Sequence, residues 1–262
     1  MIITLTTDFG LSDPFVGIMK GVIFSIVSDV QIVDITHDIR SYDILEAAFV
    51  LKTTYSYFPA GTIHVVVVDP GVGSARHPLA AFSQDHYFVA PDNGVLSFVL
   101  DTGPPNLPTI HRISNESLFQ GAISRTFHGR DIFAPTAAHL ARGAPIDTVG
   151  ERILDFVKKP LPRARPRGEN GLLARVLRID KFGNIVTDLR RDDLHDDFVI
   201  RVAGLDVTRL CESFSEADPS EFFAIEGSTG YIEIALNQGS AAERLNVPLG
   251  TEIEVETGSP NH

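Results

Sequence analysis

The feature that most constrains the fold is the run from Thr62 to Val68, which holds four consecutive valines and is polar only at His64 and at Thr62 itself. A strand with apolar residues on both faces is typical of a parallel sheet covered by helices on both sides. Around this run, β-rich segments alternate with segments of helical period, which predicts βαβ units around a mainly parallel sheet. The expected strands are Met1–Thr7, Gln31–Ile35, Thr62–Val68, Tyr87–Ala90 and Val95–Leu100, and the expected helices cover about residues 19–26, 42–54 and 131–140.

The second half is predicted to be all β. Its short apolar runs are separated by Gly, Asn and Asp turns, which is typical of a small barrel or sandwich. Before it, residues 158–170 hold three prolines and five basic residues without apolar periodicity, which favours an exposed linker over an anion-binding patch. We therefore expect an α/β class chain with an N-terminal α/β domain at residues 1–160, a linker at 161–170 and a C-terminal all-β barrel domain at 171–262. The strands expected there are Leu172–Ile179, Ile185–Leu189, Phe198–Val202 and Tyr231–Leu236.

Composition narrows the possible partners. The 262 residues carry a formal net charge of -12, so the average surface repels nucleic acid and anionic lipid, whereas a cationic small molecule would be attracted. No apolar run approaches the length of about 20 residues that spans a bilayer. The single cysteine, Cys211, excludes an intrachain disulfide, and Met1–Gly10 lacks the basic start of a signal peptide. These observations favour a cytoplasmic protein with no nucleic-acid or membrane partner.

Acidic residues follow three of the expected strands. Asp8 ends the first, Asp34 and His37 end the second, and Asp69 ends the third. Ligands of open α/β sheets bind outside the carboxyl ends of the strands, so these residues are candidates for a binding site. Each of them could instead be an ordinary helix cap or turn residue.

Two loops could carry chemistry. Asp69 and Arg76 are joined by a glycine-containing turn that lacks the GK[ST] ending of a phosphate loop, so it could hold either a structural salt bridge or a catalytic pair. His128 precedes the expected helix from Asp131 and could be an exposed loop residue or a group that faces a ligand.

Other catalytic machinery is missing from the sequence: there is no GxSxG, HExxH or CxxC motif, and Cys211 has no nearby histidine. A metal site built from Asp8, Asp69, His128 and Asp131 is a competing possibility, because these residue types bind several divalent ions.

Seven motifs along the chain resemble, in order, those of the S-adenosylmethionine hydroxide adenosyltransferases, the hydrolytic relatives of the fluorinase and chlorinase enzymes. They are TTDFG (6–10), IVDITH (32–37), VVDPGVG (67–73), PDNG (91–94), TFHGRDIFAP (126–135), DKFGN (180–184) and GSAA (239–242). The resemblance covers nearly the whole chain. It implies an α/β domain followed by a β-barrel, and a homotrimer whose active sites lie between one subunit's N-terminal domain and its neighbour's C-terminal domain.

The resemblance also implies hydrolysis of S-adenosyl-L-methionine to adenosine and L-methionine, by attack of water or hydroxide at the ribose C5′ carbon. The catalytic Asp, Arg and His of the family fall on Asp69, Arg76 and His128. No metal and no cofactor is implied, since S-adenosyl-L-methionine is the substrate. The residues that correspond to substrate-binding positions are Asp8 for the ribose diol, Asp13 and Asp180 for the methionine ammonium, Asn184 for adenine, and Asn237, Ser240 and Ala242 along the adenine pocket.

Three other functions are weighed against hydrolysis. A non-catalytic adenosine or S-adenosylmethionine sensor would bind without turnover, and a metal-dependent hydrolase would lose activity with a chelator. A halogenase would carry an extra loop in the N-terminal domain, which is not found between Asp92 and Ser114.

Overall fold

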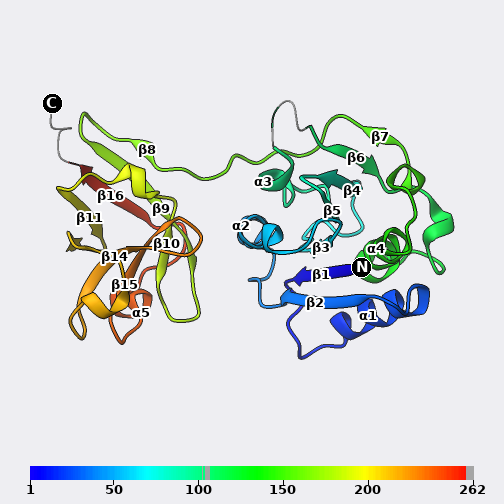
Figure 1. Ribbon diagram of the computed structural model, residues 1–262, viewed down its shortest axis with the longest axis horizontal. Helices are drawn as coiled ribbons and strands as arrows, with labels where there is room; N and C mark the ends of the chain where they lie inside the picture. The colour runs from blue at the N-terminus through cyan, green and yellow to red at the C-terminus, as the bar shows by residue number, and fades with distance from the viewer. Residues whose placement is uncertain (102, 104–106, 258–262) are drawn as a thin grey trace. The chain divides into compact units, whose positions relative to one another are not determined.

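The computed structural model describes residues 1–101, 103 and 107–257, and these form two compact units, Met1–Leu161 and the chain from Pro162 onward (Figure 1). The first unit contains β1 (Ile2–Thr7), α1 (Phe15–Ile26), β2 (Gln31–Thr36), α2 (Ile44–Thr54), β3 (Ile63–Val67), β4 (Pro78–Ser83), β5 (His86–Pro91), α3 (Ser97–Leu100), β6 (Thr109–Arg112), α4 (Ala134–Ala141) and β7 (Arg152–Ile153).

The strands of the first unit form one sheet in the order β2-β1-β3-β5-β4-β6-β7. The first four strands are parallel, but β4 is antiparallel to both β5 and β6, and β6 is antiparallel to β7. The α/β class is confirmed, whereas the expected mainly parallel sheet is in fact mixed. The cause is the connection between β4 and β5. Gln84 and Asp85 both have positive φ, as a two-residue hairpin turn requires, and so short a connection cannot supply a parallel crossover.

The valine run is buried on both faces of this sheet, as its sequence predicts. Val65 and Val67 lie in a core with Met19 of α1 and residues of α4, whereas Val66 and Val68 lie in a second core with residues of α2 and α3. The two cores hold β3 rigidly in the centre of the sheet. Asp69, two residues beyond the end of β3, therefore projects from a fixed position.

The prediction of a strand at Val95–Leu100 is wrong, because Ser97–Leu100 forms the short helix α3. All six of these residues are buried, so the segment has no polar face whose period could separate a strand from a buried helical turn. Asn93 decides the conformation, since its side chain accepts a hydrogen bond from the Val95 amide at 3.2 Å and turns the chain at once.

The second unit is a curled sheet in the order β12-β11-β16-β9-β10-β15-β14-β13, with β8 paired to β9. Within the described residues its end strands are not paired with each other, so the all-β barrel or sandwich that the sequence predicts is a curled half-barrel. Its elements are β8 (Arg165–Pro166), β9 (Gly171–Ile179), β10 (Ile185–Thr187), β11 (Phe198–Val202), β12 (Leu205–Val207), β13 (Leu210–Cys211), β14 (Phe222–Glu226), β15 (Ile232–Leu236), α5 (Ala241–Leu245) and β16 (Glu252–Thr257).

The helices of the described chain are short, and none of them is long and apolar enough to cross a membrane. The longest, α1, has 12 residues.

Candidate active site

Asp69 and Arg76 form a buried, two-pronged ion pair at the carboxyl end of β3. Arg76 Nε donates to Asp69 Oδ1 at 3.0 Å, and Arg76 Nη2 donates to Asp69 Oδ2. The side chains of Arg76 and Asp69 are only 9% and 5% exposed. The guanidinium also lies 5.4 Å from the centre of the Phe133 ring, which adds a cation–π contact. Two contacts and the surrounding burial thus fix the plane of the guanidinium.

His128 joins this pair from a segment 52 residues away, where its Nδ1 atom lies 2.7 Å from Arg76 Nη2. It directly precedes a π-helical turn, Gly129–Phe133, that leads into α4. Such turns are rare and often mark functional sites. The structure therefore brings Asp69, Arg76 and His128 into one chain of contacts with Arg76 at its centre.

Gly73 explains how the two loops come so close together. Its φ is +76°, and a Cβ atom at this position would lie 2.4 Å from the Arg125 carbonyl oxygen. Only glycine allows both that conformation and that approach. The Asp69–Arg76 loop can therefore lie directly against the segment that carries His128.

Burial and the Arg76 charge lower the pKa of the His128 imidazole below its usual value, while Asp69, Asp131 and the Ser124 backbone oppose the shift. Burial and the Arg76 charge outweigh these opposing groups, which favours the neutral ring at physiological pH. A neutral imidazole has one N–H donor and one acceptor nitrogen. Because an arginine N–H points at Nδ1, that nitrogen is the acceptor, and the hydrogen is on Nε2.

A cavity of about 270 Å³ opens beside this cluster, and Asp69 and His128 line it. One wall is aromatic. The rings of Phe9, Phe15 and Phe127 pack edge to face, with centroids 5.2 to 6.0 Å apart. Asp8 lies on the same cavity and accepts a hydrogen bond from the Tyr42 amide at 2.9 Å. The cavity thus combines an apolar wall with two carboxylates, an imidazole and a nearby guanidinium.

Two other polar residues near the strand ends lie apart from this cavity. Asp13 is exposed at the start of α1 and is not among the residues that line it. Asp34 is within β2, where its carboxylate pairs with Lys20 at 2.5 Å.

In the second unit, the turn between β9 and β10 brings several of the predicted residues together. Asp180 accepts hydrogen bonds from the amides of Phe182 and Asn184, both at 2.8 Å, and from the Asn184 side chain at 2.9 Å. Asp180, Ser240 and Ala242 line a cavity of about 500 Å³, and Ser240 caps α5. Gly183 has φ +85° and lies so close to Ser240 that a Cβ atom would be 2.0 Å from Ser240 Oγ.

Asn237 is placed elsewhere. Its side chain donates to the Ala217 carbonyl oxygen at 2.6 Å, and it does not line the cavity with Asp180.

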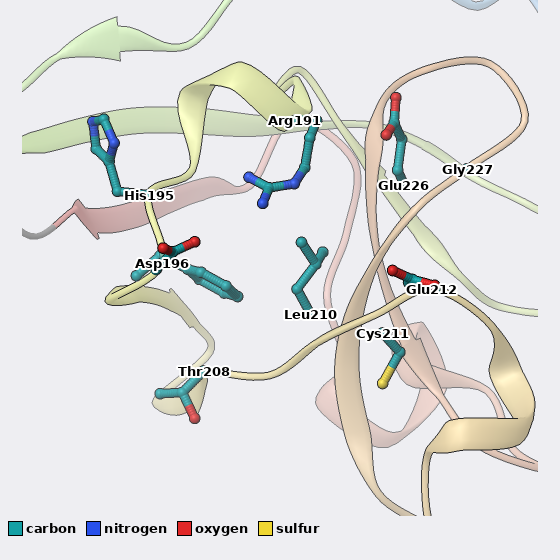
Figure 2. A pocket seen from close by; sticks show the side chains of 10 residues that line it. Arg191, His195, Asp196, Thr208, Leu210, Cys211, Glu212, Glu226 and Gly227 are labelled. Atoms are coloured by element: carbon teal, nitrogen blue, oxygen red, sulfur yellow. The ribbon is translucent and has the colours of Figure 1, made fainter.

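A larger cavity of about 670 Å³ in the second unit is bounded by segments around β11, β13 and β14 (Figure 2). Arg191, His195 and Glu226 line it, but it contains none of the residues predicted to act on a substrate. Cys211 is also on its wall, and burial raises the pKa of the Cys211 thiol, which makes it a poor nucleophile. This cavity therefore offers no catalytic cluster.

Within the described part of the chain, no group of three or more His, Cys, Asp or Glu residues is arranged to hold a metal ion. Asp131, one of the candidate ligands, is instead paired with Arg130 at 2.6 Å and accepts from the Ser124 amide. The residues Asp8, Asp69, His128 and Asp131 thus do not form the metal site considered as an alternative.

Comparison with known proteins assigns both halves of the chain. Residues 3–150 match the SAM hydroxide adenosyltransferase N-terminal domain, and residues 174–254 match the C-terminal domain of the same family. The chain belongs to the SAM hydroxide adenosyltransferase family. The resemblance carried by the seven sequence motifs is thereby confirmed.

Both hydrolases and fluorinases align with this chain over nearly its full length. The chain is 36% identical to an (R)-S-adenosyl-L-methionine hydrolase of Salinispora tropica, with 98% of each chain covered. It is 28% identical to a fluorinase of Nocardia brasiliensis, with 98% of this chain and 97% of the fluorinase covered. A solved structure of an uncharacterized conserved protein from Thermotoga maritima superposes with a TM-score of 0.87 at 37% identity, covering 97% of this chain and 99% of that one.

The aromatic residues that line the cavity beside Asp69 and His128 were not predicted from the sequence: Phe9, Phe15, Tyr42 and Phe127. Two of them had a usable signal, because Phe9 lies within TTDFG and Phe127 within TFHGRD, beside residues that were selected. Phe15 and Tyr42 had none, since each reaches the cavity from outside these motifs.

Proposed function

We propose that this chain hydrolyses S-adenosyl-L-methionine to adenosine and L-methionine, by attack of water or hydroxide at the ribose C5′ carbon. The observation that carries the proposal is the convergence of Asp69, Arg76 and His128 beside a cavity, in a member of this family. The hydrolase name of the relatives at 34 to 36% identity supports the same reaction.

The difficult part of this reaction is the activation of the nucleophile. The sulfonium group leaves as a neutral thioether, so no acid needs to protonate it, whereas water is a weak nucleophile that must approach C5′ in line with the departing sulfur. Holding water in that geometry is worth up to about 7 to 11 kcal/mol. Arg76 is permanently cationic, and its field favours hydroxide over water.

The hydrogen-bond pattern assigns the proton acceptor. His128 Nδ1 already faces an Arg76 N–H, so a neutral His128 presents an N–H, not a lone pair, at Nε2. Asp69 keeps lone pairs on both oxygens beyond those engaged by Arg76. We therefore assign Asp69 as the group that accepts the proton of the attacking water, a role worth about 10² to 10⁴ in rate, and His128, which also bonds the Ser124 backbone, as the group that holds Arg76 in place.

Binding roles follow for the remaining residues. Asp8 holds the ribose diol, Asp180 and Asp13 attract the methionine ammonium, and Asn184 contacts adenine. Ser240 and Ala242 shape the adenine pocket together with the segment from Asn237. Asp13, Asn184 and Asn237 line neither the cavity beside Asp69 nor the cavity beside Asp180, so their proposed roles come from the resemblance to the family.

The active form proposed here is a homotrimer in which a neighbouring subunit's C-terminal unit completes each site. The catalytic cluster and the Asp180 turn belong to different compact units, and a cavity of about 270 Å³ is small for the whole substrate. With a net charge of -12, the partner is a small molecule and not a nucleic acid, and the single cysteine suits a cytoplasmic location.

The decisive experiment incubates the purified protein with S-adenosyl-L-methionine in ¹⁸O-labelled water. Equimolar adenosine and methionine should form, with one ¹⁸O atom in the 5′-hydroxyl of adenosine, and Asp69→Asn should remove most of the turnover. Absence of both products would overturn the proposal, and tight binding without turnover, unchanged in Asp69→Asn, would favour a sensor. Activity should survive a chelator, since no cofactor is proposed, and loss of activity would indicate a metal-dependent hydrolase.

Halogenation is the second candidate because fluorinases also match the chain. The fluorinase alignment spans 293 positions, more than the 262 residues of this chain, so the fluorinase carries insertions, whereas the hydrolase alignment spans 261. The stretch from Asp92 to Ser114, where the extra loop was sought, includes residues 102 and 104–106, which are outside the described part. Formation of 5′-halo-5′-deoxyadenosine that depends on added halide would establish this alternative.

A further inference from the structure

A buried polar pair lies beside the turn that carries Asp8 and takes no part in the proposed chemistry. Thr7, the last residue of β1, is 0% exposed, and His37, which follows β2, is 4% exposed. Thr7 Oγ1 lies 2.9 Å from His37 Nδ1. Polar groups this deeply buried cost stability unless they are paired, so the contact is a defined part of the fold.

The pair clamps the turn that carries Asp8. The Phe9 amide donates to Thr7 Oγ1 at 3.2 Å, and the Gly10 amide donates to the His37 carbonyl oxygen at 2.8 Å. His37 therefore acts on this turn twice, once through its side chain and Thr7 and once through its backbone. The backbone on both sides of Asp8 is fixed as a result.

The Asp34 carboxylate orients the contact between Thr7 and His37. Asp34 Oδ1 can only accept and lies 3.1 Å from His37 Nε2, so a neutral His37 carries its hydrogen on Nε2, and Nδ1 accepts from the Thr7 hydroxyl. The contact between His37 Nε2 and Asp34 Oδ1 lowers the pKa of the Asp34 carboxyl, as does Lys20, although its angle falls outside the range of a regular hydrogen bond. Lys20 pairs with the other oxygen of Asp34. The hydrogen bond between Thr7 and His37 is therefore the stronger contact of the His37 ring, and the contact with Asp34 is the weaker one.

We propose that Thr7 and His37 are positioning residues that aim the Asp8 carboxylate at the ribose diol of the substrate. The inference rests on the proposed function, in which Asp8 binds ribose. Within the described chain, the Asp8 carboxylate accepts a hydrogen bond from the Tyr42 amide at Oδ2, which leaves Oδ1 for a ligand. A carboxylate binds two neighbouring hydroxyls only in a narrow range of orientations, so a clamp on its backbone sets the affinity for ribose.

The test compares the affinity for adenosine with that for 2′,3′-dideoxyadenosine, which lacks both hydroxyls. The wild-type protein should prefer adenosine by about 10-fold or more. Thr7→Val keeps the shape of the side chain but removes the hydroxyl, so most of that preference should be lost while dideoxyadenosine binds as before. A ratio of two affinities does not depend on the folded fraction, so a partly unfolded variant still gives a result.

Two substitutions of His37 separate positioning from general stability. The amide of Asn reaches the position of Nδ1 and can still bond Thr7, whereas the amide of Gln reaches that of Nε2 and cannot. His37→Asn should therefore keep the adenosine preference, and His37→Gln should lose it. Asp34→Asn, which changes the contacts of Asp34 with His37 Nε2 and with Lys20 but not the Thr7–His37 bond, is the matched control and should leave the preference within about twofold.

The outcomes distinguish the inference from the function on which it rests. A normal preference in both Thr7→Val and His37→Gln would overturn the positioning role alone. A wild-type protein that turns over S-adenosyl-L-methionine but shows no preference would overturn the ribose role of Asp8 together with this inference. A protein without turnover that shows the predicted pattern would overturn hydrolysis and leave the inference supported.

Discussion

At the scale of single residues, Arg76 is the centre of the site because it contacts both other members of the cluster. Its flat guanidinium donates through Nε and Nη2 to the Asp69 carboxylate, and Nη2 also faces His128. Its Nη1 group is buried and has no hydrogen-bond partner within the described residues. A single point charge could not hold these groups in one geometry.

Arg76→Lys should therefore lower kcat by about 10² to 10³, the usual cost of removing one donor that stabilises developing charge. Lysine keeps the positive charge but cannot engage Asp69 through two parallel bonds. Steady-state turnover, with circular dichroism to verify folding, checks this expectation. Arg112→Lys alters an exposed pair with Glu151 and should leave kcat unchanged. A normal kcat in Arg76→Lys would mean that charge alone suffices.

His64 should make stability depend on pH. Burial, with the neighbouring His86, lowers the pKa of His64 to about 3. In the unfolded chain it is near 6.5, so between these values the unfolded state binds one more proton and stability falls as the pH falls. The slope contributed is up to about 1.4 kcal/mol per pH unit. The contribution of neutral His64 to the free energy of unfolding is complete above pH 6.5 and is lost as the pH falls towards 3.

Urea unfolding of wild type and His64→Gln at pH 7 and pH 4.5 measures this contribution. The variant should lose less of its unfolding free energy on acidification. His195→Gln changes an exposed histidine and should behave like wild type. If all three proteins lost the same unfolding free energy on acidification, protonation of His64 would not destabilise the folded state.

At the scale of elements, the site depends on two loops held against each other. Gly73 is the contact point, since its missing Cβ lets the Asp69–Arg76 loop meet the Arg125 carbonyl. Gly73→Ala should therefore reduce activity by more than its loss of stability explains, because the loops must separate and Arg76 must move from His128. The comparison of kcat with the unfolding free energy tests this.

Gly61→Ala is the matched control for backbone strain. Gly61 also has positive φ, +84°, but a Cβ atom there would meet nothing within 4 Å. It should cost about 1 to 2 kcal/mol of stability and leave kcat unchanged. If both variants behave alike, loop contact has no part in the effect of Gly73.

The elements also show what can be predicted from the sequence. The valine run identified the central strand and placed Asp69 after it, because burial on both faces leaves an unmistakable pattern. Val95–Leu100 was misassigned because its uniform burial leaves no period. Spacing could not predict the contact of Arg76 with His128, since it depends on how two loops fold together across 52 residues. The resemblance to a family selected these residues, and only the structure gives their hydrogen bonds.

At the scale of the whole molecule, the proposed site needs residues from two subunits. Asp69→Asn removes the proposed proton acceptor in the N-terminal unit, and Asn184→Ala removes the proposed adenine contact in the C-terminal unit. Each variant alone should be nearly inactive. When both are co-expressed at equal levels, random assembly puts an intact N-terminal unit beside a neighbour's intact C-terminal unit in about a quarter of the sites. Turnover should therefore recover to about a quarter of the wild-type value per site.

Two controls make the recovery specific. Asp69→Asn co-expressed with Arg76→Ala should give no recovery, because both changes are in the same unit and no arrangement yields an intact site. Size-exclusion chromatography with light scattering should show trimers for every mixture, and the melting temperature of Asn184→Ala should be checked, since Asn184 also bonds Asp180. The mixture of Asp69→Asn with Asn184→Ala could also stay inactive although mixed trimers form. Both units of each active site would then come from the same subunit, because mixing subunits could not bring together two unchanged units.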